Sequence, residues 1–146
     1  MTALALVLGA GLVAGASVLT VLRRRFLAVT VSGLSMEPTL RHGDLVVVRR
    51  AGIGAVRAGR LAVIAAPPGT GRDLMVKRVL AVPGDPVPRD EIPALARTRD
   101  LVVPAGRLVV IGDNLPLSLD SRGFGYVHAQ QLLGVVVRHL PRSPRR

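Results

Sequence analysis

One lysine stands beside nineteen arginines in this chain, and this exception is the first indication of chemistry. Lys77 could be an arginine if positive charge alone were needed. The guanidinium of arginine keeps its proton in every protein site, whereas a buried lysine can become a neutral base. Apolar residues flank Lys77 in the segment LMVKRVL, which favours burial. The alternative is a lysine that remains by chance on a solvated surface.

A serine and three histidines are the other residues that could take part in proton transfer. Ser35 lies in SGLSMEPTL, where a serine near glycine and proline usually belongs to a turn. An α/β-hydrolase nucleophile needs glycine two positions later, and Glu37 stands there instead. The neighbours of His42, His128 and His139 do not mark any of them as a base. We expect these histidines on the surface or at strand edges.

The composition favours one small domain rich in strands. A chain of 146 residues has room for one modest core. With three aromatic residues, that core must consist of Val, Leu, Ile and Ala, and runs of valine favour strands. The net charge of +11 suggests an anionic surface as partner, but the scattered arginines and scarce aromatic residues argue against nucleic acid. Without cysteine, disulfides and zinc knuckles are excluded.

Apolar runs and turn residues divide the chain into strands and loops. Residues 86–100 hold three prolines and much charge, which indicates an exposed excursion. We expect Asp113 and Asn114 to cap a turn. The fold class is mainly β, with strands expected at 27–31, 44–49, 61–67, 75–82 and within 101–114, and a final strand after a short turn of helix at 129–133.

The N-terminus contains an uncharged run at residues 3–22 that ends at three arginines. As a helix, this run is long enough to cross about 30 Å of hydrocarbon. A cleavable signal peptide is the competing interpretation, although no basic segment precedes the run. We expect one N-terminal transmembrane helix within an anchor at 1–25, a main domain at 26–140 and a basic tail at 141–146.

Three segments of the main domain together indicate a family. In order, they are SGLSMEPTLRHGDLV, VKRVLAVPGD and GDNLPLSLDSRGFGYV. Their order and spacing resemble those of the type I signal peptidases, the membrane-anchored Ser/Lys endopeptidases of the S26 type. The resemblance covers residues 28–137. It implies a small signal-peptidase-type β domain behind the anchor, with Ser35 as the nucleophile and Lys77 as the general base.

The resemblance also implies supporting residues around this pair. Ser118 is expected to hydrogen-bond the lysine amine, and Asp120 and Arg122 are expected to form an ion pair that braces the site. The chemistry is consistent, because a buried lysine takes a proton from serine only when its charged form is disfavoured. A serine hydroxyl satisfies the amine without adding the negative charge that would restore the ammonium.

The oxyanion hole and the substrate pocket are less well marked in the sequence. Some family members carry a serine two positions before the nucleophile, and Gly33 stands there in this chain. The backbone N–H groups of Ser35 and Gly33 are the candidate oxyanion donors. Met36 and Val76, which adjoin the two reactive residues, are candidates for a pocket that selects small side chains.

The resemblance implies a membrane-bound serine endopeptidase that removes signal or leader peptides from exported precursors after small residues. Its expected partners are precursors with small-x-small cleavage sites and the lipid bilayer, with no metal or organic cofactor and no nucleic acid. The catalytic domain is expected on the extracytoplasmic face of the cell membrane, although Arg23 to Arg25 favour the opposite orientation. The sequence leaves the oligomeric state open.

Three alternatives remain beside this interpretation. The chain could be a dedicated maturation protease for one precursor. It could be an inactive, membrane-attached scaffold, which would have no need of Ser35, Lys77 and Ser118 together. A self-cleaving Ser/Lys protein like the repressors of the SOS response would need a DNA-binding N-terminal domain in place of the hydrophobic run.

Overall fold

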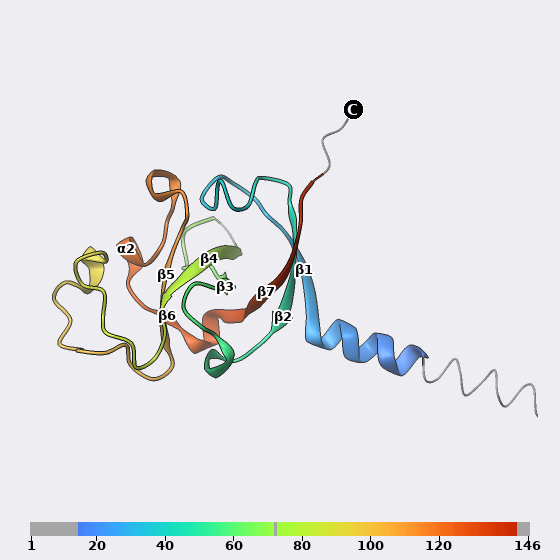
Figure 1. Cartoon of the computed structure of the whole chain (residues 1–146), viewed down its shortest axis with the longest axis horizontal. Coiled ribbons are helices and arrows are strands. Elements are labelled where there is room, and N and C mark those ends of the chain that lie inside the picture. Colours follow the sequence, from blue (N-terminus) through green and yellow to red (C-terminus); the bar gives the residue numbers. More distant parts are fainter. Residues whose placement is uncertain (1–14, 72, 143–146) are drawn as a thin grey trace, which may run out of the picture.

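The computed structural model describes residues 15–71 and 73–142 of the chain. Residues 15–25 are helical and exposed, and this helix projects from the main domain (Figure 1). Most of the expected membrane span at 3–22 lies outside the described residues. Within the described ranges, no helix has the length and apolar character to cross a membrane.

The main domain is one curled antiparallel sheet of seven strands, so the prediction of a mainly β fold is confirmed (Figure 1). Neighbouring strands pair in the order β1-β2-β7-β3-β4-β5-β6. The strands are β1 Phe26–Thr30, β2 Leu45–Arg50, β3 Leu61–Ala65, β4 Leu74–Ala81, β5 Arg107–Ile111, β6 Val127–His128 and β7 Leu132–Leu140. The sheet therefore places segments that are distant in sequence side by side, as where β7 lies between β2 and β3.

The helices of the main domain are short and lie in its loops. They are the 3-10 helices η1 Ile53–Ala55, η2 Pro93–Leu95, η3 Leu115–Leu117 and η4 Ala129–Gln131, and the α-helix α2 Ser121–Phe124. The turn of helix expected at 129–133 is η4, which ends earlier because Leu132 begins β7. The strand expected within 101–114 begins only at Arg107, since Pro104 interrupts it.

Valine and other branched residues supply the core, as the composition predicts. Two clusters of buried side chains line the curled sheet, one including Ile64, Val79 and Leu108 and the other including Val46 and Val63. Irregular pairing within β2–β7, β3–β7 and β4–β5 accompanies the curl, because bulges bend a sheet and increase its twist.

The expectation of an exposed excursion at 86–100 is only partly right. Val87, Ile92 and Leu95 are buried there and form a third apolar cluster with Val103 and Val109. The prolines and charges that suggested an exposed loop stand between apolar residues that turn inward.

Candidate active site

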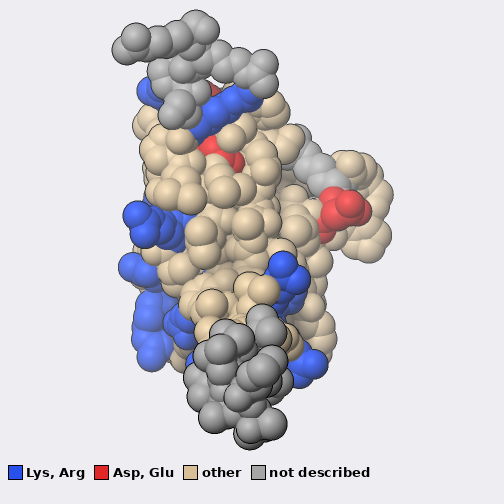
Figure 2. Space-filling view, turned by 90° about the vertical axis from the view of Figure 1, so that its right-hand side faces the viewer, with Lys and Arg blue, Asp and Glu red and all other residues tan. Residues whose placement is uncertain are grey.

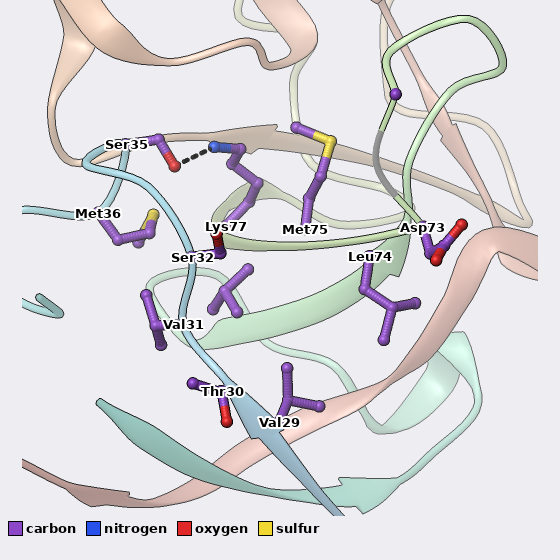
Figure 3. A pocket seen from close by; sticks show the side chains of 12 residues that line it. Val29, Thr30, Val31, Ser32, Ser35, Met36, Asp73, Leu74, Met75 and Lys77 are labelled. Carbon is purple, nitrogen blue, oxygen red and sulfur yellow. Dashed lines mark hydrogen bonds between the residues drawn. The ribbon is translucent and has the colours of Figure 1, made fainter. Parts of the chain in front are cut away.

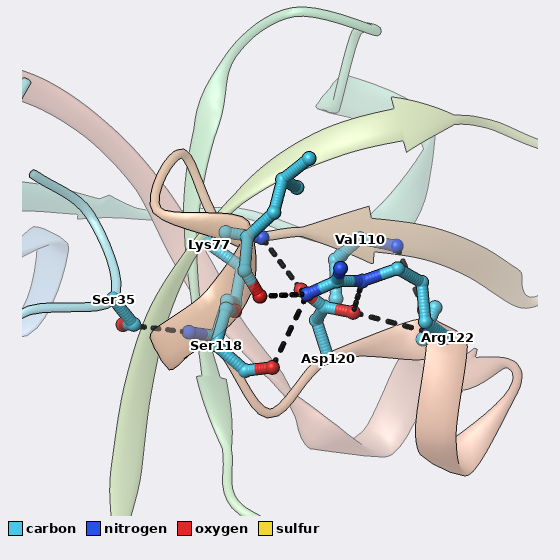
Figure 4. Close-up of polar contacts among 9 residues, drawn as sticks. Ser35, Lys77, Val110, Ser118, Asp120 and Arg122 are labelled. Carbon is cyan, nitrogen blue, oxygen red and sulfur yellow. Dashed lines mark hydrogen bonds and ion pairs between the residues drawn. The ribbon is translucent and has the colours of Figure 1, made fainter. Parts of the chain in front are cut away.

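Ser35 and Lys77 meet in the described structure, 42 positions apart in sequence. The Lys77 Nζ donates a hydrogen bond of 2.7 Å to the Ser35 Oγ (Figure 4). Lys77 lies within β4 and is 1% exposed, and Ser35 is 9% exposed. β4 fixes the lysine because Ala62 of β3 pairs with it on the same sheet. The two residues that the sequence marked as nucleophile and base therefore form one buried polar pair.

Asn114 fastens the turn that carries Ser35. Its backbone N–H donates to the Ser35 carbonyl at 3.0 Å, and its side-chain Nδ2 donates to the Leu34 carbonyl at 3.1 Å. It also closes its own turn, because its carbonyl accepts from the Leu117 N–H. The expected turn is present, but sequence reasoning missed the contact with the serine. The adjacent Asp113 already suggested a polar role for this segment.

An ion pair joins β4, the strand that carries Lys77, to the loop after β5. Arg78 donates to both carboxylate oxygens of Asp113, at 2.7 and 2.6 Å. These hydrogen bonds lower the pKa of Asp113 and raise the pKa of the Arg78 guanidinium. Two-point contacts of this kind fix orientation as well as distance. The pair holds the end of β5 against the residue that follows Lys77.

Asp120 is buried and accepts several hydrogen bonds from residues of the segment after β5. It accepts hydrogen bonds from the Gly112 N–H, the Arg122 N–H and the Arg122 guanidinium, whose Nε lies 2.9 Å from Oδ1 (Figure 4). Burial alone would raise the pKa of Asp120, but the hydrogen bonds from Arg122 and Gly112 outweigh it and lower the pKa. The ion pair that the resemblance implies is present, and the carboxylate also caps α2.

Ser118 lies at the site but does not make the expected bond. Its Oγ is buried and has no hydrogen-bond partner within the described ranges. The bond to the Lys77 amine is therefore absent, although the hydroxyl contributes to the low pKa of the neighbouring Asp120. The hydroxyl packs instead against Gly112, where an added Cβ would lie 2.0 Å from the Ser118 Oγ and 2.7 Å from the Ser35 carbonyl oxygen. Glycine at 112 therefore permits the close approach of both serines.

Gly33 does not suit the role of oxyanion donor that we expected. Its N–H donates to the His42 Nδ1 at 3.2 Å and is thereby occupied. His42, which its sequence neighbours did not mark, thus holds the turn two residues before Ser35. Its Nδ1 must be unprotonated to accept this bond. The Ser35 N–H remains the candidate donor.

Asp44 links the C-terminal end of the described chain to the turn that precedes β2. Asp44 accepts hydrogen bonds from the Arg142 N–H and the Arg41 N–H, both at 2.9 Å, and lies 2.7 Å from the His139 Nε2. These contacts, that of Arg142 first, lower the pKa of Asp44 from 3.8 to about 2. His139 was expected at a strand edge, and its pairing with Asp44 was not predicted.

A pocket of about 550 Å³ opens beside the Ser35–Lys77 pair, between the β1 end and the start of β4 (Figure 3). Both predicted pocket residues, Met36 and Val76, line it. The lining residues are Val29, Thr30, Val31, Ser32, Ser35, Met36, Gly71, Asp73, Leu74, Met75, Val76 and Lys77. Among the strands of the described residues, β1 lies at the edge of the sheet and pairs with β2, so its other edge is open for pairing.

The described residues contain no group of three or more His, Asp or Glu side chains that could hold a metal ion. Basic side chains outnumber acidic ones on the face in Figure 2, in keeping with the net charge of +11. The chemistry available at the site is that of a buried serine hydroxyl, a buried amine and an adjacent pocket.

Comparison with known proteins places this arrangement in a family. Residues 3–93 and 89–140 match the family described as signal peptidase, peptidase S26. The chain belongs to this family, whose members are signal-peptide-cleaving peptidases.

Two relatives illustrate the range of the family. The chain is 32% identical over 143 residues to signal peptidase IB of Staphylococcus aureus (strain COL), and the match covers 73% of each chain. It is 31% identical over 105 residues to mitochondrial inner membrane protease subunit 1 of Schizosaccharomyces pombe, covering 66% of this chain and 61% of the relative.

Proposed function

We propose that this protein is a membrane-bound serine endopeptidase that removes signal or leader peptides after small residues. Ser35 is the nucleophile and Lys77 the general base. The observation that carries the proposal is the 2.7 Å contact between the Lys77 Nζ and the Ser35 Oγ in a buried setting. Membership of the signal peptidase family supports the same reaction.

Burial favours the neutral form of Lys77 that this role requires. An ammonium group removed from water loses hydration, so its charged form becomes less favourable. Two carboxylates of the segment after β5 are each paired with an arginine. Asp113 pairs with Arg78, and Asp120 pairs with Arg122. Those arginines offset negative charge that would otherwise hold the proton on the amine.

The reaction follows from this pair in two stages. The Ser35 hydroxyl donates its proton to the Lys77 Nζ as its Oγ attacks the scissile carbonyl carbon, and the protonated amine then gives that proton to the leaving nitrogen. The leader remains as an ester on Ser35. Lys77 next takes a proton from water, which attacks the ester carbonyl. The leader leaves with a carboxylate, and Ser35 regains its proton.

One group is assigned to the negative charge that develops in this reaction. The Ser35 N–H donates to the oxyanion, which develops on the carbonyl oxygen. Removing one oxyanion donor typically costs about 10²–10³ in kcat, so this single backbone group is important.

The pocket suggests how the substrate binds. An extended precursor segment can add as a strand to the open edge of β1, with β4 on its other side. Alternate side chains of that segment then point toward the pocket beside Ser35. Met36 and Val76 restrict the space near the scissile bond, which selects small residues at the cleavage position and two positions earlier.

The anchor is the remaining part of the proposal. We assign residues 3–22 to a single membrane span and the catalytic domain to the extracytoplasmic face, with Arg23 to Arg25 among anionic headgroups. The family match begins at residue 3 and so includes this apolar run. Protection of the domain from added protease in intact spheroplasts would contradict this orientation.

The first experiment is cleavage of a precursor with a small-x-small site by the purified full chain in lipid. Wild type, Ser35→Ala and Lys77→Arg are compared, with the cleaved bond located by mass spectrometry and folding checked by circular dichroism. We expect cleavage by wild type alone. Normal cleavage by folded Lys77→Arg would overturn the general-base role, because arginine cannot become neutral.

Other results separate the alternatives. If wild type cleaves one precursor among many, a dedicated maturation protease is indicated. If folded wild type cleaves none of a broad set, the inactive scaffold is indicated and the proposed reaction is wrong.

A further inference from the structure

The pocket carries a negative charge at the end opposite to the Ser35–Lys77 pair. Asp73 lines the pocket just before β4, and Figure 3 shows it far from Ser35 and Lys77. Among the described lining residues, Asp73 and Lys77 are the two with ionisable side chains. Lys77 is buried, whereas Asp73 is exposed and accessible to a bound peptide.

The Asp73 carboxylate is not used by the fold. Its backbone carbonyl accepts from the Ala66 N–H and continues the β3–β4 ladder. Its side chain makes no hydrogen bond or ion pair with any of the described residues, unlike the carboxylates of Asp44, Asp113 and Asp120. A carboxylate on a pocket rim in a chain of net charge +11 is therefore open to a cation from elsewhere.

We infer that Asp73 is a specificity-determining residue that favours precursors with lysine or arginine four or five positions before the scissile bond. This inference rests on the proposed function. Asp73 is four residues from Lys77 along an extended strand, which corresponds to about 13 Å at about 3.3 Å per residue. A substrate strand beside β4, with its scissile bond at Ser35, brings its fourth or fifth upstream residue to the same distance.

The pocket also sets the direction of that strand. It extends from Ser35 along residues 29–32 of the chain and toward Asp73. The small residues at the cleavage position and two positions earlier occupy the part beside Met36 and Val76. The leader side of the precursor therefore runs toward Asp73. Lysine and arginine have long side chains that reach a rim carboxylate while their apolar stems lie along the pocket wall.

The test is a lysine scan through a peptide substrate. A baseline peptide with a small-x-small site carries alanine at six positions before and two positions after the site, and each alanine is replaced in turn by lysine or glutamate. We expect lysine at the fourth or fifth upstream position to raise kcat/KM by about two- to fivefold, the size expected for an exposed ion pair. Glutamate there should lower it, and high salt should reduce both effects.

Variants assign the effect to one carboxylate. Asp73→Asn should abolish the lysine preference, and Asp73→Lys should reverse it in favour of glutamate, where the preference is the ratio of kcat/KM for the lysine or glutamate peptide to that for the baseline peptide with the same variant. Asp90→Asn is the matched control, because Asp90 is also exposed but does not line the pocket. Arg72→Gln removes the opposite charge that precedes Asp73 in the sequence and should strengthen the preference.

The outcomes distinguish the inference from the proposed function. If the baseline peptide and a full precursor are not cleaved, the proposed function fails. If they are cleaved with dependence on Ser35 but the lysine scan is flat, the inference alone is wrong. A lysine preference that persists in Asp73→Asn also overturns it.

Discussion

The candidate active site and the excursion at residues 86–100 are held by different kinds of contact. At the site, separate segments meet through polar groups, as in Lys77 with Ser35 and Arg78 with Asp113. The excursion instead buries an apolar cluster that includes Ile92 and Leu95. Hydrogen bonds and ion pairs are directional and set geometry, whereas apolar burial is not directional and stabilises in proportion to area. The site should therefore control activity, and the excursion should control stability.

Among the substitutions that test this difference between the two regions, the largest effect on activity is expected at Lys77. Lys77→Met keeps the length of the side chain but removes the base, so we expect kcat to fall by about 10²–10⁴-fold. The free energy of unfolding should stay the same or rise, because a buried amine is replaced by an apolar group. Peptide cleavage and urea unfolding measure the two quantities. A large loss of stability would show that the amine is structural.

The excursion should give the opposite result. Ile92→Ala removes a fully buried side chain from the third cluster and should cost about 2–5 kcal/mol of unfolding free energy. Cleavage per folded molecule should be unchanged. Leu101→Ala is the matched control, because Leu101 is 78% exposed and should have little effect. If Ile92→Ala lowers kcat in the folded fraction, the separation between the two regions is broken.

Gly112 tests how tightly the site is packed. Gly112→Ala would place a Cβ against the Ser118 side chain and 2.7 Å from the Ser35 carbonyl, and rotation of Ser118 cannot relieve the second contact. We expect a cost of about 1–3 kcal/mol in stability and a clear loss of cleavage, because Ser35 must move.

Gly123→Ala provides the control for this substitution. The nearest atom to its added Cβ is the Leu119 Cδ1 at 3.7 Å, which is ordinary contact. Its stability and activity should be close to those of wild type. Equal behaviour of the two alanine variants would contradict the tight approach at Gly112.

The smallest effect is expected in acid, at the turn that carries Asp44. The pKa of Asp44 is lowered from 3.8 to about 2, chiefly by hydrogen bonds from Arg142 and Arg41. Its contribution to stability is therefore full above about pH 4 and is lost as the pH falls toward 2, because the unfolded chain takes up the proton first. The melting temperatures of wild type and Asp44→Asn should converge over this range. A constant difference would contradict the assignment.

Sequence reasoning reached the elements and the reactive pair but missed most of the contacts that hold them. Periodicity and valine content are local properties, so the strands other than the two-residue β6 were predicted to within a few residues, and the motif resemblance marked Ser35 and Lys77. Contacts such as His42 with Gly33 depend on how turns approach one another across the sheet, which local patterns do not encode. The burial of Ile92 was missed because prolines and charges dominate its neighbourhood.

The buried lysine also offers a spectroscopic opportunity. Since Lys77 is the only lysine of the chain, growth on isotopically labelled lysine places the label at one side chain. Nuclear magnetic resonance of that sample would then report a single amine without site assignment. Its chemical shift as a function of pH would give the protonation state of the group beside Ser35 directly, before any substrate is identified.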